Sequence, residues 1–199
     1  INYAAAHLPA ILHAWFPGEF CGQAVAEALF GDYNPGGRLA VTFPKSVGQI
    51  PFAFPFKPGS DEPCETAVYG ALYPFGYGLS YTKFSYKNLQ ITPEEQGPQG
   101  EITVSCEVTN TGDRTGDEVV QLYLRDEVSS VTTYMKVLRG FERITLNPGE
   151  TKKVTLILTP QDLGLWDKNN KFVVEPGMFK VMIGAASTDI RLEGKFNIK

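Results

Sequence analysis

The stretch EITVSCEV, residues 101–108, decides the fold class because its apolar and polar residues alternate with a period of two. Successive side chains of a β-strand point to opposite faces, so this alternation predicts a strand with one buried face. Comparable runs lie on both sides of it. The predicted strands are residues 84–91, 101–108, 119–124, 136–144, 153–158, 171–174, 178–185 and 189–198.

Turn residues separate these runs, as at Asn110-Thr111-Gly112 and Asn147-Pro148-Gly149. About seven short strands spaced by turns indicate an antiparallel β-sandwich of immunoglobulin-like architecture. A true antibody-type domain is disfavoured because the Cys…Trp…Cys pattern is missing. The aromatic residues predicted to face mostly inward are Phe84, Tyr86, Tyr123, Phe141, Trp166, Phe172 and Phe179. We therefore expect no row of exposed aromatics of the kind a carbohydrate-binding module presents.

Residues 1–58 follow a different pattern. Residues 10–15 and 38–43 are short, mostly apolar runs that predict strands, and residues 21–30 between them predict a helix with Gly31 as its C-cap. Strand, helix and strand make one βαβ unit of an open α/β sheet. Because one unit cannot bury both faces of its own sheet, we expect this region to be only part of an α/β-sandwich domain.

Residues 59–83 are expected to link that partial domain to a β-sandwich of residues 84–199. The region around the linker is rich in proline and in aromatic residues. The aromatic residues are Phe52, Phe54, Phe56, Tyr69, Tyr73, Phe75, Tyr77 and Tyr81. Two interpretations stay open: they pack the connector over a neighbouring domain, as most buried aromatics do, or they form a platform on which sugars stack.

Composition argues against several classes of function. The 199 residues carry a net charge of −4 with a pI near 5.3, and no cluster of Lys and Arg stands out, which disfavours a nucleic-acid partner. No apolar run reaches the roughly 18 to 20 residues of a membrane span. The first residues, INYAAAH, contain neither an initiator Met nor a basic region, so we expect the sequence to begin inside a longer chain.

No metal or cofactor is expected. Cys21, Cys64 and Cys106 stand far apart without CxxC spacing, which disfavours a zinc site and a dense disulfide framework. Cys106 lies in an alternating strand and is expected to be a buried thiol. Asp61-Glu62 and Glu65 suggest a calcium loop, but their spacing does not match an EF-hand, and we interpret them as a solvated acidic turn.

Several motifs stand in a fixed order along the chain. They are WFPGE (15–19), AVAEALFGD (24–32), NPGGRLAVTFP (34–44), YPFGYGLSYT (73–82), NTG (110–112), GDEVVQLY (116–123) and LRGF (138–141). The first three resemble the second half of the α/β-sandwich domain of family 3 glycoside hydrolases, and the fourth resembles the segment that leaves that domain. The others are similar to signatures of the family's C-terminal fibronectin type III-like domain. VGQIP, residues 47–51, looks more like the β-glucosidase branch of the family than the xylosidase branch.

The resemblance implies a retaining β-glycosidase. In such an enzyme one carboxyl group attacks the anomeric carbon, and the other protonates the leaving oxygen and then activates water. The family carries the nucleophile, an Asp, in an N-terminal barrel domain, and commonly a Glu acid/base upstream of the WFPG segment. No position of this chain matches either residue, so we expect the 199 residues to support the enzyme without carrying catalytic residues.

Trp15 and Glu19 are the candidates for contact with substrate. Glu19 follows a Pro-Gly turn at an edge where open α/β sheets often bind ligands; alternatively its charge complements the dipole of the next helix. Trp15 can stack on a sugar ring or simply pack the end of its strand. Asp32 is expected to serve the turn that follows it, and Arg38 to pair with a carboxylate of the α/β core or its interface.

Two hypotheses of different classes remain. The first is the C-terminal portion of a glycosidase that hydrolyses terminal β-linked glucosyl residues of oligosaccharides or glycosides, with a β-xylosidase of the same family as its variant. The second is a free-standing β-sandwich that binds carbohydrate or protein. A binding module has no use for an incomplete α/β sheet, which favours the first hypothesis. The family suggests a periplasmic or secreted location and a carbohydrate substrate held through other domains, and it is compatible with a homo-oligomer.

Overall fold

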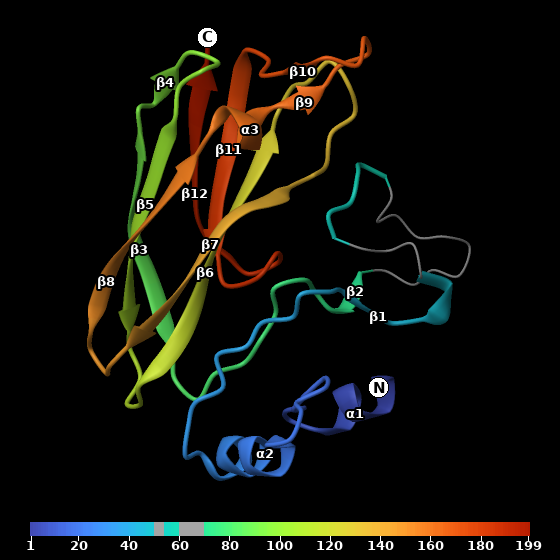
Figure 1. Cartoon of the computed structure of the whole chain (residues 1–199), viewed down its shortest axis with the longest axis vertical. Helices are drawn as coiled ribbons and strands as arrows, with labels where there is room; N and C mark the ends of the chain where they lie inside the picture. Colours follow the sequence, from blue (N-terminus) through green and yellow to red (C-terminus); the bar gives the residue numbers. More distant parts are fainter. Residues whose placement is uncertain (50–53, 60–69) are drawn as a thin grey trace.

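The computed structural model describes residues 1–49, 54–59 and 70–199, which form an elongated β-sandwich with a smaller, partly helical segment at one end (Figure 1). The elements before the sandwich are α1 (Asn2–His7), α2 (Cys21–Phe30), β1 (Phe43–Pro44), a 3-10 helix (Val47–Gln49) and β2 (Ala71–Tyr73). The elements of the sandwich are β3 (Phe84–Thr92), β4 (Glu95–Gln96), β5 (Ile102–Asn110), β6 (Gly116–Asp126), β7 (Val137–Leu146), β8 (Thr151–Leu158), α3 (Pro160–Leu163), β9 (Leu165–Trp166), β10 (Phe172–Val173), β11 (Gly177–Gly184) and β12 (Ile190–Ile198).

Two sheets face each other across the core of the sandwich. One has the strand order β3-β5-β8, and the other has the order β4-β12-β11-β6-β7. Their ladders are antiparallel apart from the short pair of β12 with β4. Each strand predicted between residues 84 and 198 is present, with its ends within three residues of the prediction. The predicted fold class, an α/β remnant followed by an immunoglobulin-like sandwich, is confirmed.

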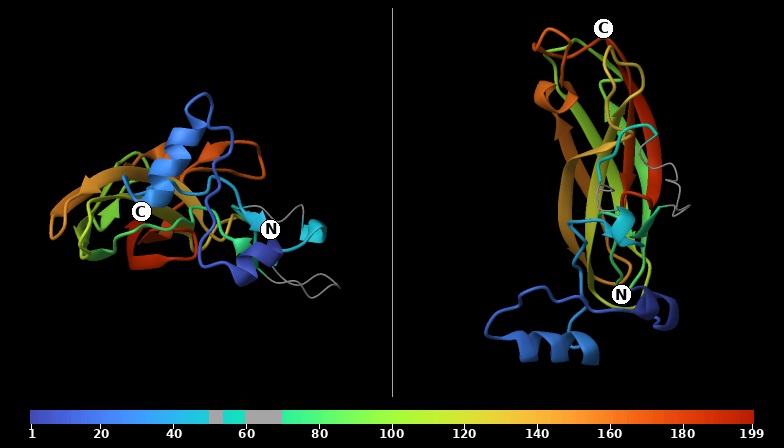
Figure 2. Two further views of the ribbon diagram at one scale, coloured as in Figure 1. Left: turned by 90° about the horizontal axis from the view of Figure 1, so that it is seen from below. Right: turned by 90° about the vertical axis from the view of Figure 1, so that its right-hand side faces the viewer.

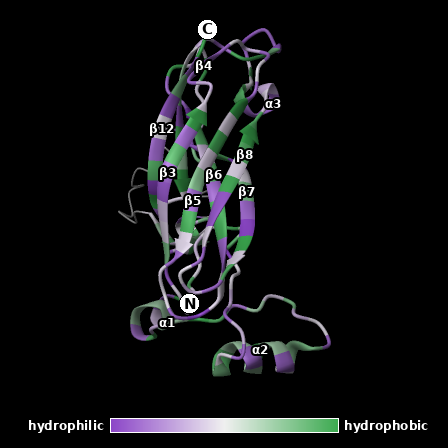
Figure 3. Ribbon diagram, turned by 90° about the vertical axis from the view of Figure 1, so that its left-hand side faces the viewer, coloured by the Kyte–Doolittle hydropathy of each residue, from purple (hydrophilic) through white to green (hydrophobic). Residues whose placement is uncertain are grey.

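Strand β5 shows how alternation in the sequence produces the core. Ile102, Val104, Cys106 and Val108 are at most 2% exposed, whereas Thr103 between them is exposed. The same alternation of apolar and polar residues runs along the neighbouring strands (Figure 3). Burying one such aliphatic side chain contributes about 1.5–3 kcal/mol relative to leaving it in water.

The main hydrophobic core lies entirely within residues 84–198. Phe179 and Phe196 stack inside it, with ring centroids 5.4 Å apart. Within the part of the chain that the structure describes, no side chain that precedes β3 belongs to this core, although Ala28 is buried elsewhere. The core of the sandwich therefore includes none of the described residues before β3.

Helix α2 has the predicted bounds, but the strands predicted on either side of it differ from the structure. Gly31 ends the helix with a φ of 82°, the left-handed conformation that suits glycine. Residues 10–15 form no strand, and of residues 38–43 only Phe43 enters one, in β1. A strand needs a neighbouring backbone for its N–H and C=O groups. For residues 10–15 and 38–43 the described chain supplies a ladder partner only at Phe43, which pairs with Tyr73 of β2.

The apolar side of α2 is largely uncovered. The helix lies across the lower end of the sandwich (Figure 2), where the Tyr81 hydroxyl donates to the carbonyl oxygen of Ala28 at 2.7 Å. Leu29 and Phe30 are nevertheless 65% and 85% exposed, and Phe16 in the preceding loop is fully exposed. Exposed apolar clusters mark surfaces that pack against further protein.

Residues 37–44 and 71–78 run antiparallel beside the larger sheet (Figures 1 and 2), and we call this pair the connector ribbon. Backbone N–H groups of Leu39 and Gly76 donate to the carbonyl oxygens of Tyr77 and Leu39, at 2.9 and 2.7 Å. Strands β1 and β2 continue the pairing. The ribbon therefore carries the backbone from α2 along the sheet and back to the start of the sandwich.

The described aromatic residues of the connector mostly pack against the sandwich or one another. Phe54 stacks on Phe75 with centroids 4.7 Å apart and meets Tyr123 of β6 edge-on at 5.6 Å. Tyr81 is the exception, at 48% exposure. For these residues the structure favours the packed connector over a sugar platform. The residues Phe52, Tyr69, Cys64, Asp61, Glu62 and Glu65 lie outside the described part of the chain.

Three aromatic residues predicted to face inward are exposed, so that prediction is wrong for them. Phe141, Trp166 and Phe172 are 64%, 65% and 45% exposed. Phe141 lies opposite Gln121 in the register of β6 and β7, on the outer face of the sheet. Trp166 and Phe172 are cross-strand partners in the separate hairpin of β9 and β10. A period of two does not say which face is inward, nor that a hairpin lies outside both sheets.

The two described cysteines are free thiols in different surroundings. Cys106 is 2% exposed, which confirms the predicted buried thiol, whereas Cys21 is exposed. Burial raises the pKa of the Cys106 thiol to about 11, with smaller contributions from Glu107 and Glu142. Cys106 therefore stays protonated at neutral pH.

Candidate functional site

Trp15 lies in the loop between α1 and α2, and its side chain is 56% exposed. Its backbone has a φ of 51°, which is uncommon for residues other than glycine and costs about 1–3 kcal/mol. Such conformations persist only where the surroundings hold them, and they cluster at functional sites. Residues 10–15 form no strand, so Trp15 does not lie at the end of one, and its half-exposed ring stands on a backbone in the left-handed region.

Trp15 begins a row of rings that leads to the connector ribbon. Its ring lies edge-on to His13 at 4.3 Å and to Phe43 at 6.3 Å, between centroids. Phe43 is 6.3 Å from Tyr73, its ladder partner, and Tyr73 stacks on Tyr77 at 5.4 Å. Edge-to-face and offset pairs at such distances are favourable. We call these five residues the aromatic row.

A buried ion pair attaches the ribbon to β6. Arg38 Nη2 donates to Glu118 Oε1 at 2.8 Å, and the two side chains are 8% and 3% exposed. Arg38 Nη1 also donates to the carbonyl oxygens of Gly36 and Gly37, at 3.3 and 3.1 Å. Burial raises the pKa of the Glu118 carboxyl, and the Arg38 charge opposes this rise. The predicted pairing of Arg38 with a carboxylate at an interface is confirmed.

Asn34 joins three segments beside this pair. Its Oδ1 accepts hydrogen bonds from Ser80 Oγ at 3.1 Å and from the N–H of Tyr81 at 2.8 Å, and its Nδ2 donates to the carbonyl oxygen of Thr115 at 3.3 Å. A side chain at Gly36 would come within 2.6 Å of a side-chain carbon on β6. The Asn-Pro-Gly-Gly sequence therefore allows the loop to approach β6 closely, in addition to forming a turn.

Glu19 is not joined to the aromatic row. It lies before Phe20, the N-cap of α2, and so outside the first helical turn. It is exposed and has no hydrogen bond or ion pair with any residue in the described ranges. Asp32 is also exposed, and its N–H donates to the carbonyl oxygen of Glu27 at the end of α2. Of the two predicted site residues, the structure thus connects only Trp15 to the connector ribbon, through Phe43.

Two carboxyl groups near the opposite end of β6, those of Asp126 and Glu175, serve the fold. Burial raises the pKa of Asp126, and the neighbouring Glu175 charge adds to this effect. Asp126 Oδ1 accepts the N–H of Val128 at 3.2 Å, and Glu175 Oε2 accepts the N–H of Ser130 at 2.8 Å. These bonds hold the loop after β6. A retaining glycosidase instead needs two carboxyl groups that face one sugar about 5 Å apart.

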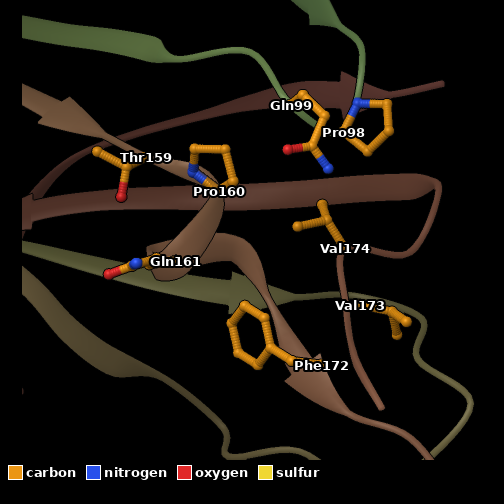
Figure 4. A pocket seen from close by; sticks show the side chains of 8 residues that line it. All are labelled: Pro98, Gln99, Thr159, Pro160, Gln161, Phe172, Val173 and Val174. Carbon is orange, nitrogen blue, oxygen red and sulfur yellow. The ribbon is translucent and has the colours of Figure 1, made fainter.

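An open cavity of about 810 Å³ lies near α3 and β10, away from α2 (Figures 1 and 4). Its lining residues are Pro98, Gln99, Thr159, Pro160, Gln161, Phe172, Val173 and Val174. None of these side chains is ionisable, so the cavity offers no group for acid–base chemistry. Among the described residues, no group of three or more His, Cys, Asp or Glu side chains is placed to hold a metal ion, and no helix has the length and apolarity of a membrane span.

Sequence reasoning did not identify the two residues of β6 that contact the ribbon, Glu118 and Gln121. Gln121 is 3% exposed, and its Nε2 donates to the carbonyl oxygen of Gly76 at 3.2 Å. A signal was present, since Glu118 and Gln121 flank the apolar pair Val119-Val120 and Gln121 precedes the apolar run Leu122-Tyr123-Leu124. Buried polar groups require partners, so such positions mark contacts with another segment.

The comparisons with known proteins divide the chain in the same way as the structure does. Residues 1–81 match a family described as the glycosyl hydrolase family 3 C-terminal domain. Residues 118–187 match a family described as a fibronectin type III-like domain. The first match holds α1, α2 and the connector ribbon, and the second lies within the sandwich.

Known relatives align with nearly the whole chain, and so with both regions. A β-xylosidase of Formosa agariphila is 47% identical over 191 residues, which cover 94% of this chain and 26% of the relative. A periplasmic β-glucosidase of Salmonella typhimurium is 42% identical over 200 residues, covering 95% and 26%. A solved β-glucosidase from Erythrobacter marinus matches with a TM-score of 0.93 and 43% identity, over 98% of this chain and 26% of that one. The chain spans about a quarter of the length of these relatives.

Proposed function

Because this chain belongs to the C-terminal region of the family 3 glycoside hydrolases, we propose that it is the supporting C-terminal portion of a retaining β-glycosidase. The proposed reaction is hydrolysis of terminal β-linked glucosyl residues of oligosaccharides or glycosides. The observation that carries the proposal is the order of the two family matches, together with relatives that align over more than nine-tenths of the chain. A free-standing binding module would not need the region that the first match covers, residues 1–81.

In this proposal the catalytic carboxyl groups come from domains outside the 199 residues. Glu19 is exposed and unpaired among the described residues, and Glu118 is already engaged by Arg38. Asp126 and Glu175 accept backbone N–H groups of the loop after β6. A nucleophile and an acid/base must both be free to face one anomeric carbon. Of these four carboxyl groups only Glu19 is free, so they do not supply the pair.

Trp15 is the residue that we propose to contact the sugar. The Trp15 ring is exposed, and its backbone is strained. The ring contacts His13 and Phe43 and not the hydrophobic core. Pyranose rings present C–H faces that pack on aromatic faces, and a ring held in one place loses little conformational entropy on binding. Glu19, in the same loop, is a second and weaker candidate for a hydroxyl contact.

A β-xylosidase is the second candidate, because the Formosa agariphila relative at 47% identity carries that name. Glucose and xylose differ by one hydroxymethyl group, and a single such group in a pocket is worth about 1–3 kcal/mol of discrimination. The choice between the two sugars therefore depends on a few pocket contacts, which the catalytic domains would supply.

Two measurements test the proposal. The purified chain alone should not hydrolyse p-nitrophenyl β-D-glucoside or β-D-xyloside. A chimera in which these 199 residues replace the aligned region of the Salmonella typhimurium β-glucosidase should hydrolyse the glucoside. Turnover by the isolated chain would overturn the supporting role and would make Glu19 the first residue to substitute.

Trp15 is tested in the same chimera. Trp15→Ala should raise KM about 2- to 10-fold, the equivalent of about 0.5–1.5 kcal/mol of aromatic contact. Trp166→Ala is the matched control, because Trp166 has a similar exposure, 65%, but lies in the β9–β10 hairpin. Equal effects of the two substitutions would remove the support for Trp15 as a sugar contact.

A further inference from the structure

We propose that Gln121 and Glu118, both on β6 of the sandwich, are positioning residues for Trp15. They hold the connector ribbon, and the ribbon holds the ring of Trp15 through the aromatic row. The inference rests on the proposed function, in which Trp15 stacks on a sugar. In this inference the sandwich orients Trp15 for its contact with the sugar, although neither Gln121 nor Glu118 touches the sugar.

Gln121 is the first attachment point. Its side chain lies on the outer face of the larger sheet but is only 3% exposed, because the connector covers it. Its Nε2 donates to the carbonyl oxygens of Gly76 at 3.2 Å and Ala185 at 2.6 Å, and its Oε1 accepts the hydroxyl of Tyr123. Both donors and the acceptor are thus engaged, so the carboxamide has one orientation and fixes the turn at Gly76.

The ribbon fits β6 closely at this turn. Gly76 has a φ of 81°, and any side chain there would overlap the Gln121 carboxamide. The N–H of Gly76 donates to the carbonyl oxygen of Leu39 at 2.7 Å, so the turn that meets Gln121 also joins the two halves of the ribbon. Two successive hydrogen bonds therefore link Gln121 to the segment that carries Phe43.

Glu118 is the second attachment point. Its buried ion pair holds Arg38, the residue that precedes Leu39 in the same half of the ribbon. The two attachments to β6, at Gly76 in one half of the ribbon and at Arg38 in the other, fix the direction of the ribbon as well as its position. Beyond them the ribbon presents Phe43, whose ring contacts Trp15. A loss of either attachment should therefore make the ring of Trp15 more mobile, although Gln121 and Glu118 lie in the sandwich and Trp15 lies in the loop before α2.

The test uses the emission of Trp15 in the full chain. The chain has two tryptophans, so Trp166→Phe leaves Trp15 as the only one. In this background, Gln121→Leu and Gly76→Ala should each lower the fluorescence anisotropy of Trp15 and increase its quenching by acrylamide. Gly76→Ala disturbs the contact from the ribbon side, so it keeps the test valid if Gln121→Leu fails to fold.

The control is Leu158→Ala, which weakens the core without touching the ribbon. Leu158 is 1% exposed and ends β8, which leads to α3 at the opposite end of the sandwich from α2 (Figure 1). With circular dichroism showing a folded sandwich, this variant should leave the anisotropy of Trp15 unchanged. If the Gln121 and Gly76 variants also leave it unchanged, or if Leu158→Ala lowers it equally, the positioning role is refuted.

A cellobiose titration separates this inference from the proposed function. If cellobiose shifts the Trp15 emission in the parent, Gln121→Leu should weaken the binding of cellobiose. The loss is about tenfold if about one molecule in ten keeps Trp15 in its binding orientation. Equal affinity of parent and variant would overturn the positioning role. If Trp15→Ala leaves the affinity of the chimera for cellobiose unchanged while Gln121→Leu still loosens Trp15 in the full chain, the positioning role stands and the sugar contact of the proposed function fails.

Discussion

The buried ion pair between Arg38 and Glu118 should be far more important for stability than any exposed pair of the chain. Its atoms are 2.8 Å apart, and the side chains are 8% and 3% exposed. Removing one partner of such a pair leaves the other charge buried, which costs about 3–5 kcal/mol, whereas exposed pairs contribute about 0–1 kcal/mol. We therefore expect Glu118→Leu to lower the free energy of unfolding by about 3–5 kcal/mol.

Urea unfolding followed by circular dichroism measures this change. With a slope of about 2 kcal/mol per molar urea, the expected loss moves the midpoint down by about 1.5–2.5 M. Glu127→Leu is the matched control, because Glu127 pairs with Lys195 at the same distance, 2.8 Å, but the side chains are 29% and 52% exposed. A midpoint for Glu118→Leu within about 0.5 M of the parent, or equal to that of the control, would refute the reasoning from burial.

The same pair predicts a difference in pH dependence between the two single variants. Arg38→Met leaves Glu118 buried without the charge that lowers its pKa, so the folded pKa should rise further above the ordinary value of 4.5. A carboxyl with a raised folded pKa binds its proton more tightly in the folded state, so the stability due to protonation is present below the unfolded pKa and is lost as pH rises through the folded pKa. Arg38→Met should therefore be more destabilised at pH 8 than at pH 5, whereas Glu118→Leu should show no such trend.

Three further predictions concern the sandwich. Residues 84–199 alone should unfold cooperatively in urea, because they contain the whole main core, while residues 1–58 alone should show no cooperative transition. Asn110→Ala should cost about 2–4 kcal/mol in the same assay, since Asn110 is fully buried and its carboxamide makes four hydrogen bonds. Cys106 should resist a thiol reagent at pH 8 until the chain unfolds, whereas Cys21 should react at once, which mass spectrometry of the labelled peptides can distinguish.

The strands of the sandwich were predictable because each pairs with a neighbour within the chain. In β5 the apolar residues Ile102, Val104, Cys106 and Val108 lie against the core, and Thr103 on the other face is exposed. The same argument failed for residues 10–15, whose apolar run is typical of a buried strand but has no ladder partner among the described residues. Local pattern gives the tendency to extend, and only a neighbouring backbone turns an extended segment into a strand.

The candidate site was only partly predictable, for two physical reasons. Trp15 was identified as an aromatic residue near a turn, but its φ of 51° depends on how the loop closes over Phe43, which sequence pattern does not contain. The partner of Arg38 was predicted as a carboxylate, but its identity depends on a contact between residues 80 positions apart. Contacts at such separations follow from the fold, not from local propensity.

The polar residues of β6 nevertheless carried information that a purely hydrophobic interpretation discards. Glu118 and Gln121 interrupt a strand whose other central residues are apolar, and leaving either one buried without partners would cost about 1–3 kcal/mol or more. A fold keeps such residues only when another segment supplies their hydrogen bonds. The connector ribbon supplies a partner to each, Arg38 to Glu118 and the carbonyl oxygen of Gly76 to Gln121. Apolar residues of β6 thus pack in the core, whereas its polar residues Glu118 and Gln121 contact the connector ribbon.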